Sequence, residues 1–348
     1  MNHDQLYDTT LRHFLAPIND LLDDDSVTEV MVNGPTSVYV ERNGRVELTD
    51  RSFRSGSFLL AAVRNLAEFV GRPLDSENLS MDGRLPNGSR IHLMLPPVSR
   101  SGICLTIRKF RQSAFTLEEL VARGSVEQPA ADILRTAIEE HLNIVVAGGT
   151  GTGKTSLLNA LSREICPSER IIVIEESSEL KLIQPHTVYL EAIPKGMAGN
   201  DRASLRELFV NALRMRPDRI MIGEVRRGEA LELIQSMLSG HSGSLSTLHA
   251  SSPSAAATRL ETLCMLNDAQ LPVYVARAQV AAAVDLFVQV KRSAAGHRYV
   301  SEISNLVGLD SQQNYVWSAL YQHATKKEKM MSLATAKGDL LTAAGNVA

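Results

Sequence analysis

The sequence predicts an α/β protein of two domains, and three observations lead to this fold class. The chain has 348 residues, which is too many for one ordinary core and suits two domains of unequal size. Apolar residues make up 44% of the chain, enough for two cores. Near residue 126 the pattern changes from paired alternating strands to helices that alternate with short apolar strands, which predicts parallel βαβ units.

The first part of the chain reads as an N-terminal helical segment, 1–25, followed by a small α/β domain, 26–110. Apolar residues between 11 and 22 recur at helical spacing. Alternating apolar residues, separated by turn signals such as Asn33-Gly34-Pro35, then predict a largely antiparallel sheet. The expected strands are 27–32, 37–41, 46–48, 90–95 and 103–108, and the expected helix of the domain is 58–70.

The second part of the chain reads as a parallel-sheet domain, 126–323, behind a polar linker, 111–125, that includes a short helical piece at 116–121. The segment 324–348 contains a charged lysine cluster and many small residues, so we expect a disordered tail. A hairpin is expected to pair 285–290 with 298–307. The other expected strands are 143–147, 171–174, 187–190, 219–223 and 245–248, and the expected helices are 155–165, 204–214, 228–238 and 253–265.

Composition excludes several classes of protein. The net charge of −3 and the pI near 6.3 provide no general basic field for nucleic acid, so we expect no nucleic-acid partner. Cys104, Cys166 and Cys264 form no closely spaced pair, which favours reduced thiols. The N-terminus lacks the features of a signal peptide, and no apolar run is long enough to span a membrane. We therefore expect a cytoplasmic protein that reaches a membrane only through a partner.

The most informative stretch is a phosphate-binding loop, or P-loop. It reads Gly148-Gly149-Thr150-Gly151-Thr152-Gly153-Lys154-Thr155 and is followed by Ser156. An apolar strand precedes it and a helix-forming stretch follows, so backbone N–H groups and the helix N-terminus converge on one anion. Lys154 is expected to reach the β- and γ-phosphates and Thr155 to bind Mg²⁺. A chance glycine turn is the alternative, but the strand and helix around the loop argue against it. The sequence predicts binding of a nucleoside triphosphate.

Acidic residues end two apolar strands of the second domain. Glu175 and Glu176 follow 171–174, and Glu224 follows 219–223. Ligands of open α/β sheets bind at the carboxyl ends of the strands. We expect Glu224 to orient the attacking water, and Glu175 and Glu176 to hold Mg²⁺ partly through water. Taken singly, each acid has an alternative interpretation as a solvated strand end.

Two histidines, His241 and His249, flank a glycine-serine turn and a strand at 245–248. A histidine at a strand end beside a nucleotide can sense the terminal phosphate, and it can equally be a structural hydrogen-bonding residue. Spacing leaves both interpretations open.

The motifs together resemble the type II/type IV secretion ATPase superfamily, and within it most closely the motor ATPases of tight-adherence (Tad) pili. The resemblance covers roughly residues 20–320. In the second domain it lies in the P-loop and in 174–180, 214–226 and 240–250. In the first domain it lies in 30–35, 38–42, 84–90 and 105–110.

The resemblance implies a RecA-like P-loop ATPase domain preceded by a PAS-like domain, assembled as a homohexameric ring. It makes 148–156 the Walker A loop and Glu224 the Walker B glutamate. It places Glu175, Glu176 and Glu179 in an acidic box, and His241 and His249 in a histidine box. It also implies arginines that reach an ATP site from the first domain, for which Arg84, Arg90 and Arg108 are candidates.

The chain departs from the family at two positions and at its end. Glu176 stands where the family usually has aspartate. The side chain of glutamate is the longer of the two, which affects the geometry of bound Mg²⁺. Arg227 stands where relatives often have a small residue, and the sequence gives no reason for it. The segment 324–348 matches nothing in the family.

The expected function is an ATP-hydrolysing hexameric motor that powers pilus assembly or protein secretion. It would work at the cytoplasmic face of the inner membrane, with ATP and Mg²⁺ as cofactors and a membrane platform protein as partner. The alternative is a conjugation-type secretion ATPase or nucleic-acid translocase. A GTP switch protein would carry an Asn-Lys-x-Asp motif after the loop, and none occurs. A small-molecule kinase would exclude water and would not place a water-orienting glutamate at Glu224.

Overall fold

The computed structural model describes residues 11–42, 44–71, 74–75, 78–85, 87–109, 115–193, 204–267 and 271–323. The chain divides into two compact units, Met1–Ser113 and Ala114–Ala348, each described by itself below. The expected tail, 324–348, and the first ten residues lie outside the described residues. None of the described helices is long and apolar enough to cross a membrane.

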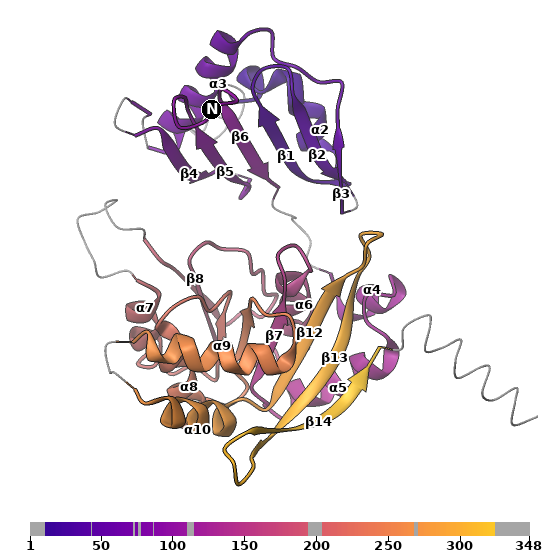
Figure 1. Ribbon diagram of the computed structural model, residues 1–348, viewed down its shortest axis with the longest axis vertical. Helices are drawn as coiled ribbons and strands as arrows, with labels where there is room; N and C mark the ends of the chain where they lie inside the picture. Colours follow the sequence, from indigo (N-terminus) through magenta and orange to yellow (C-terminus); the bar gives the residue numbers. More distant parts are fainter. Residues whose placement is uncertain are drawn as a thin grey trace, which may run out of the picture. The chain divides into compact units, whose positions relative to one another are not determined.

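Unit 1 is an antiparallel sheet of six strands packed on a helix (Figure 1). The strand order is β3-β2-β1-β6-β5-β4. Leu59, Val63 and Leu66 of α3 are buried against the apolar residues of the strands. The elements are β1 (Val27–Asn33), β2 (Val38–Arg42), β3 (Arg45–Leu48), α3 (Gly56–Phe69), β4 (Ser80–Arg84), β5 (Arg90–Met94) and β6 (Cys104–Arg108).

Two details of unit 1 differ from the sequence prediction. The expected helix at 11–22 is broken into pieces, with η1 (Ala16–Ile18) and α2 (Asn19–Asp23) after a first turn. Pro17 explains the break, because proline lacks the N–H that a continuous helix requires. Strand β4 was not predicted, since only Met81 of its five residues is buried and the strand lies at the sheet edge.

Unit 2 is an eight-stranded sheet with helices on both faces, and its order is β14-β13-β12-β7-β11-β10-β8-β9 (Figure 1). The strands from β12 through β7, β11, β10 and β8 to β9 are parallel to one another. At the other edge, β13 and β14 are added to the sheet in antiparallel pairs. The strands are β7 (Ile144–Gly148), β8 (Ile171–Glu175), β9 (Thr187–Glu191), β10 (Arg219–Ile222), β11 (Leu245–Leu248), β12 (Leu286–Arg292), β13 (Arg298–Leu309) and β14 (Tyr315–Gln322).

Two hydrophobic cores lie on the two faces of this sheet. Side chains alternate between them, so that Val145 faces one core and Val146 the other. One face carries α7 (Leu205–Ala212), α8 (Glu229–Leu238), α9 (Pro253–Met265) and α10 (Val273–Ala283). The other carries α4 (Leu117–Ala122), α5 (Gln128–Glu139) and α6 (Lys154–Ser162).

The parallel βα pattern and the C-terminal hairpin predicted from sequence are confirmed in unit 2. The elements α5, α10 and β14 were not predicted. Leu117 and Leu120 of α4 lie in the core of unit 2, so this part of the expected linker packs as a helix of the second unit. Its first turn is closed by a capping box between Thr116 and Glu119.

Candidate functional site

The P-loop lies between a fully buried strand and a helix, as its chemistry requires. Strand β7 ends at Gly148, and α6 begins at Lys154. A Cβ on Gly148 would lie 2.6 Å from Thr152 Oγ1 and 2.7 Å from the carbonyl oxygen of Val290, so only glycine fits there. Gly151 and Gly153 have φ of +69° and +98°, in the left-handed region that favours glycine. The loop therefore has the backbone of a phosphate cradle at a helix N-terminus.

Lys154 is buried and folded back on the loop. Its ammonium donates to the carbonyl oxygens of Gly148 and Gly149, at 3.2 and 3.1 Å, and lies 3.4 Å from Nδ1 of His249. The cation is thus held at the place where a phosphate chain enters the loop.

His249 connects Lys154 to Glu224. Its Nε2 lies 2.8 Å from Oε1 of Glu224. Burial and the Lys154 ammonium lower the pKa of the imidazole, with Glu224 opposing them. A neutral ring has an acceptor nitrogen, and with Nδ1 in that role the imidazole accepts from the Lys154 ammonium. The contact between Nε2 and Glu224 is one of proximity, since within the described residues no hydrogen bond reaches Oε1 of Glu224.

Glu224 is half-buried just beyond β10. Its second oxygen, Oε2, accepts a hydrogen bond of 2.7 Å from Arg226, whose other amino group donates to Glu176, also at 2.7 Å. Burial opposes ionisation of Glu224, but the Arg226 hydrogen bond and charge, with His249 and Lys154, outweigh it and lower the pKa below the ordinary value. The carboxylate is therefore ionised at neutral pH, as a proton acceptor must be.

The expected Mg²⁺ residues occupy three different environments. Thr155 donates its hydroxyl hydrogen to Oε2 of Glu179, at 2.9 Å. Glu175 is buried, and its Oε1 accepts from the backbone N–H groups of Glu179 and Leu180. Glu176 is bound by Arg226. Of these acidic-box carboxylates, that of Glu179 contacts Thr155, from the loop that follows β8.

The two histidines lie at opposite edges of the sheet. His249 follows β11 and lies at the carboxyl edge with the P-loop, whereas His241 precedes β11 and lies at the amino edge. Within the described part of the chain, the backbone of His241 bonds to Ser236 and Ser244, and its hydrogen bonds do not join the Lys154–Glu224 chain. The two histidines are close in sequence, but the strand between them separates their environments.

The three candidate arginines of unit 1 form a row across neighbouring strands. Arg84 of β4 is opposite Arg90 of β5, and Arg90 is opposite Arg108 of β6. Residues directly opposite in an antiparallel sheet share a face, and like charges there repel. Glu29 of β1 ends the row opposite Arg108. Burial raises the pKa of Glu29, with Arg108 opposing. A row of this kind is suited to a multiply charged anion.

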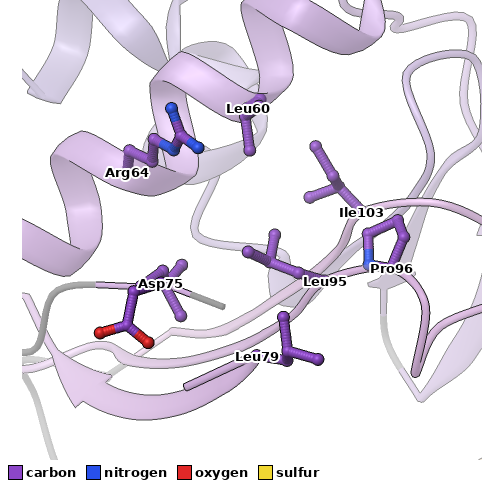
Figure 2. Close-up of a pocket in the computed structure, with 8 residues that line it drawn as sticks. Leu60, Arg64, Asp75, Leu79, Leu95, Pro96 and Ile103 are labelled. Atoms are coloured by element: carbon purple, nitrogen blue, oxygen red, sulfur yellow. The ribbon is translucent and has the colours of Figure 1, made fainter. Parts of the chain in front are cut away.

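A separate apolar cavity of about 430 Å³ lies in unit 1 (Figure 2). Its walls include Leu60, Leu79, Leu95 and Ile103, and Arg64 and Asp75 are its charged lining residues. It offers neither a phosphate loop nor the linked acid and imidazole of unit 2, so the candidate site is the one at the P-loop.

A parallel sheet covered on both faces, with a P-loop at its carboxyl edge, defines a P-loop nucleotide-binding protein. The chain belongs to the type II/IV secretion system protein family, whose model matches residues 13–328.

Two relatives illustrate this membership, and one solved structure shows a similar fold. A putative conjugal transfer protein of Mycobacterium tuberculosis is 36% identical over 295 residues, which cover 83% of each chain. The type IV secretion system protein PtlH of Bordetella pertussis is 34% identical over 307 residues, covering 80% of this chain and 90% of PtlH. The Legionella pneumophila ATPase DotB has a similar fold, with a TM-score of 0.58 at 18% identity over 94% of this chain and 84% of DotB.

Sequence reasoning did not assign roles to two residues of the site. Arg226 bridges Glu224 and Glu176, and its position two residues after Glu224 was the available signal. Glu179 was placed in the acidic box without a partner, and its contact with Thr155 depends on the loop that follows β8.

Proposed function

We propose that this chain hydrolyses ATP and uses the energy to power a secretion or pilus machine. The observation that carries the proposal is the chain of contacts from Lys154 through His249 to Glu224 beside the P-loop. This chain of contacts links a lysine, the residue type that contacts the terminal phosphates in a P-loop, to the ionised carboxylate of Glu224. Phosphoryl transfer to water needs such a pair, with one group at the phosphate and another that orients the water.

In this mechanism Glu224 accepts a proton from the attacking water, and His249 holds that carboxylate in place. Lys154 exchanges the carbonyls of Gly148 and Gly149 for phosphate oxygens. Arg226 keeps Glu224 ionised while nucleotide is absent. His241 is left outside the mechanism.

The residues around Thr155 fit Mg²⁺, because its neighbours offer carboxylate and hydroxyl oxygens, the ligands that this ion prefers. We propose Thr155 as the direct ligand and Glu179 as the nearest acid, with Glu175 and Glu176 acting through water. Bound Mg²⁺ would neutralise charge on the phosphate oxygens.

The test is release of phosphate from ATP with no acceptor present. We expect turnover by the unaltered chain, its loss when Mg²⁺ is chelated, and loss of both turnover and nucleotide affinity in Lys154→Ala. A small-molecule kinase would need an acceptor to release ADP. Full turnover in Lys154→Ala would show that the P-loop is not the site.

We further propose a homohexamer with ATP as the nucleotide, at the cytoplasmic face of the inner membrane, bound to a platform protein there. The motif resemblance supports this arrangement and a PAS-like class for unit 1. The row of Arg84, Arg90 and Arg108 supports a phosphate-contacting role for unit 1. The system served would be a Tad-like pilus.

A conjugation-type ATPase or nucleic-acid translocase is the second candidate, favoured by the name of the mycobacterial relative. The net charge of −3 argues against this candidate, because it provides no general basic field for nucleic acid. Measuring ATP turnover with and without single- and double-stranded DNA separates the two. Stimulation that disappears at higher salt would favour the translocase.

A further inference from the structure

The β12–β13 hairpin forms one side of a cavity next to the P-loop. The cavity measures about 390 Å³, within the range of small-molecule sites. Gly149 and Thr152 of the loop line it, together with Ala250 and Ser251, which follow His249 directly. The rest of its wall comes from the hairpin: Gln289, Val290, Lys291, Arg292 and Tyr299.

These neighbours locate the cavity at the terminal-phosphate end of the loop. Lys154 reaches Gly149 and His249, and both are at the cavity or one residue from its wall. In a P-loop the lysine contacts the β- and γ-phosphates. Space on this side of Lys154 is therefore space for the end of the phosphate chain.

The charge of the cavity suits an anion. Its lining residues include two cations, Lys291 and Arg292, and no carboxylate. The guanidinium of Arg292 lies against the loop apex, since its Nη1 is 3.5 Å from where a Cβ of Gly151 would be. Arg298 is directly opposite Arg292 on β13, and like charges opposite one another repel. A bound anion would reduce that repulsion.

Gln289 provides a second and independent observation. Its side chain lines the cavity and is 1% exposed, and among the described residues no hydrogen bond reaches its amide oxygen. A buried polar atom is normally satisfied, so this oxygen is an acceptor available to a donor at the cavity wall. Water that accompanies a terminal phosphate is such a donor.

The hairpin is anchored, so these side chains are held in position. The imidazole of His297 contacts the carbonyl oxygen of Gly124 at 3.1 Å, and the backbone N–H of Val300 donates to Ser125 at 2.9 Å. Strand β12 also runs beside β7, with Val290 paired to Gly148 at the start of the loop.

We propose that this cavity receives the terminal phosphate of the nucleotide and that Arg292 contacts it from the same subunit. The inference rests on the proposed function and extends it: unit 2 supplies its own arginine to the phosphates, in addition to any contribution from unit 1. Arg292 would make the site prefer a nucleoside triphosphate to a diphosphate, because only the triphosphate reaches the cavity. A planar guanidinium suits this contact better than an ammonium.

The test compares the affinities of a non-hydrolysable ATP analogue, AMP-PNP, and of ADP, both with Mg²⁺, by calorimetry. Arg292→Gln should weaken AMP-PNP by about tenfold or more, the usual effect of losing a hydrogen bond to a charged group, and should leave ADP within about twofold. Arg292→Lys should recover part of the loss. Lys291 is exposed, so Lys291→Gln should also lower the affinity for AMP-PNP relative to that for ADP, but by less than Arg292→Gln. Arg214→Gln, at an exposed arginine after α7, is the matched control and should change neither affinity.

The outcomes separate this inference from the proposed function. An unaltered chain that binds neither nucleotide contradicts the proposed function itself. If that chain binds both, and the ratio of the two affinities stays unchanged in Arg292→Gln and Lys291→Gln, only the terminal-phosphate cavity is overturned. Equal weakening of both nucleotides by Arg292→Gln would also overturn it, because the contact would then involve phosphates that ADP shares.

Discussion

At the scale of single residues, the site is built on one carboxylate with cations on both sides. One oxygen of Glu224 accepts a hydrogen bond from Arg226, and the other oxygen contacts Nε2 of His249. The Lys154 ammonium contacts the other ring nitrogen of this imidazole, Nδ1. This arrangement keeps Glu224 ionised in spite of partial burial. The contact with Arg226 also occupies the carboxylate, so it has to rearrange when water is to be activated.

Replacement of Glu224 separates binding from chemistry. In Glu224→Gln the amide keeps the shape of the side chain but is a far weaker proton acceptor, so hydrolysis should fall by roughly 10² to 10⁴, typical of losing a general base. ATP binding should survive. Phosphate release and calorimetry measure the two effects. Loss of ATP binding in this variant would mean that Glu224 holds Mg²⁺ or the fold, and our assignment would be wrong.

Two of the cysteines, Cys166 and Cys264, differ in environment, which predicts an order of reactivity. A hydrogen bond from Ser168 lowers the pKa of the exposed Cys166 thiol. Burial, with Glu232 and Glu261, raises the pKa of Cys264 to about 12. The thiolate is the reactive form, so a thiol reagent at about pH 8 should modify Cys166 first and reach Cys264 only after unfolding. Peptide mass spectrometry checks the order, with Cys166→Ser as the control. Equally fast labelling of Cys264 in the folded protein would contradict it.

At the scale of elements, the P-loop depends on close contact between β7 and β12. Gly148 ends β7 where the carbonyl of Val290 and the hydroxyl of Thr152 leave no room for a side chain. The same contact sets the hairpin beside the loop, so one glycine determines both the phosphate cradle and the wall of the neighbouring cavity.

Two substitutions in the same loop test this packing. Gly148→Ala should destabilise unit 2 by about 1 to 3 kcal/mol, the usual cost of overpacking, and should weaken nucleotide binding. Gly149→Ala is the matched control for stability, because its Cβ would meet only Thr152, at 3.7 Å, and its backbone is unstrained. Thermal unfolding of both variants measures the difference. Equal Tm values would show that β12 moves aside at no cost.

At the scale of the whole molecule, two units with separate cores carry different parts of the proposed chemistry. Unit 2 contains the P-loop and the Lys154–Glu224 chain, and unit 1 contains the arginine row.

Mixed assemblies test the contribution of unit 1. Arg108→Ala should fold and bind ATP but turn over slowly, as loss of an arginine finger does. If the contact is made between subunits, mixing Arg108→Ala with Lys154→Ala subunits should restore some activity, since some interfaces regain both parts.

The matched control is Arg45→Ala, an exposed arginine on the edge strand β3, which should turn over normally. Native mass measurement with nucleotide should also show a hexamer. Unchanged turnover in Arg108→Ala would contradict the role of this residue and direct attention to Arg84 and Arg90.

By itself, the sequence determined the P-loop, the parallel βα pattern and the family. These features are local: glycine spacing, a β-branched run before it and a helix-forming run after it are enough to specify strand, loop and helix. The carboxyl-edge position of Glu224 also followed, because the end of a predicted strand indicates which edge a residue occupies.

Only the tertiary structure decided which side chains meet. His241 and His249 are eight residues apart in the sequence, yet only the second reaches Glu224, because a strand carries the chain across the sheet between them. Glu179 contacts Thr155, and Arg292 covers the loop from a strand far along the chain. Arg84, Arg90 and Arg108 become a row through strand register. Such contacts depend on pairing and packing between distant segments, and hydrophobic periodicity carries no information about these.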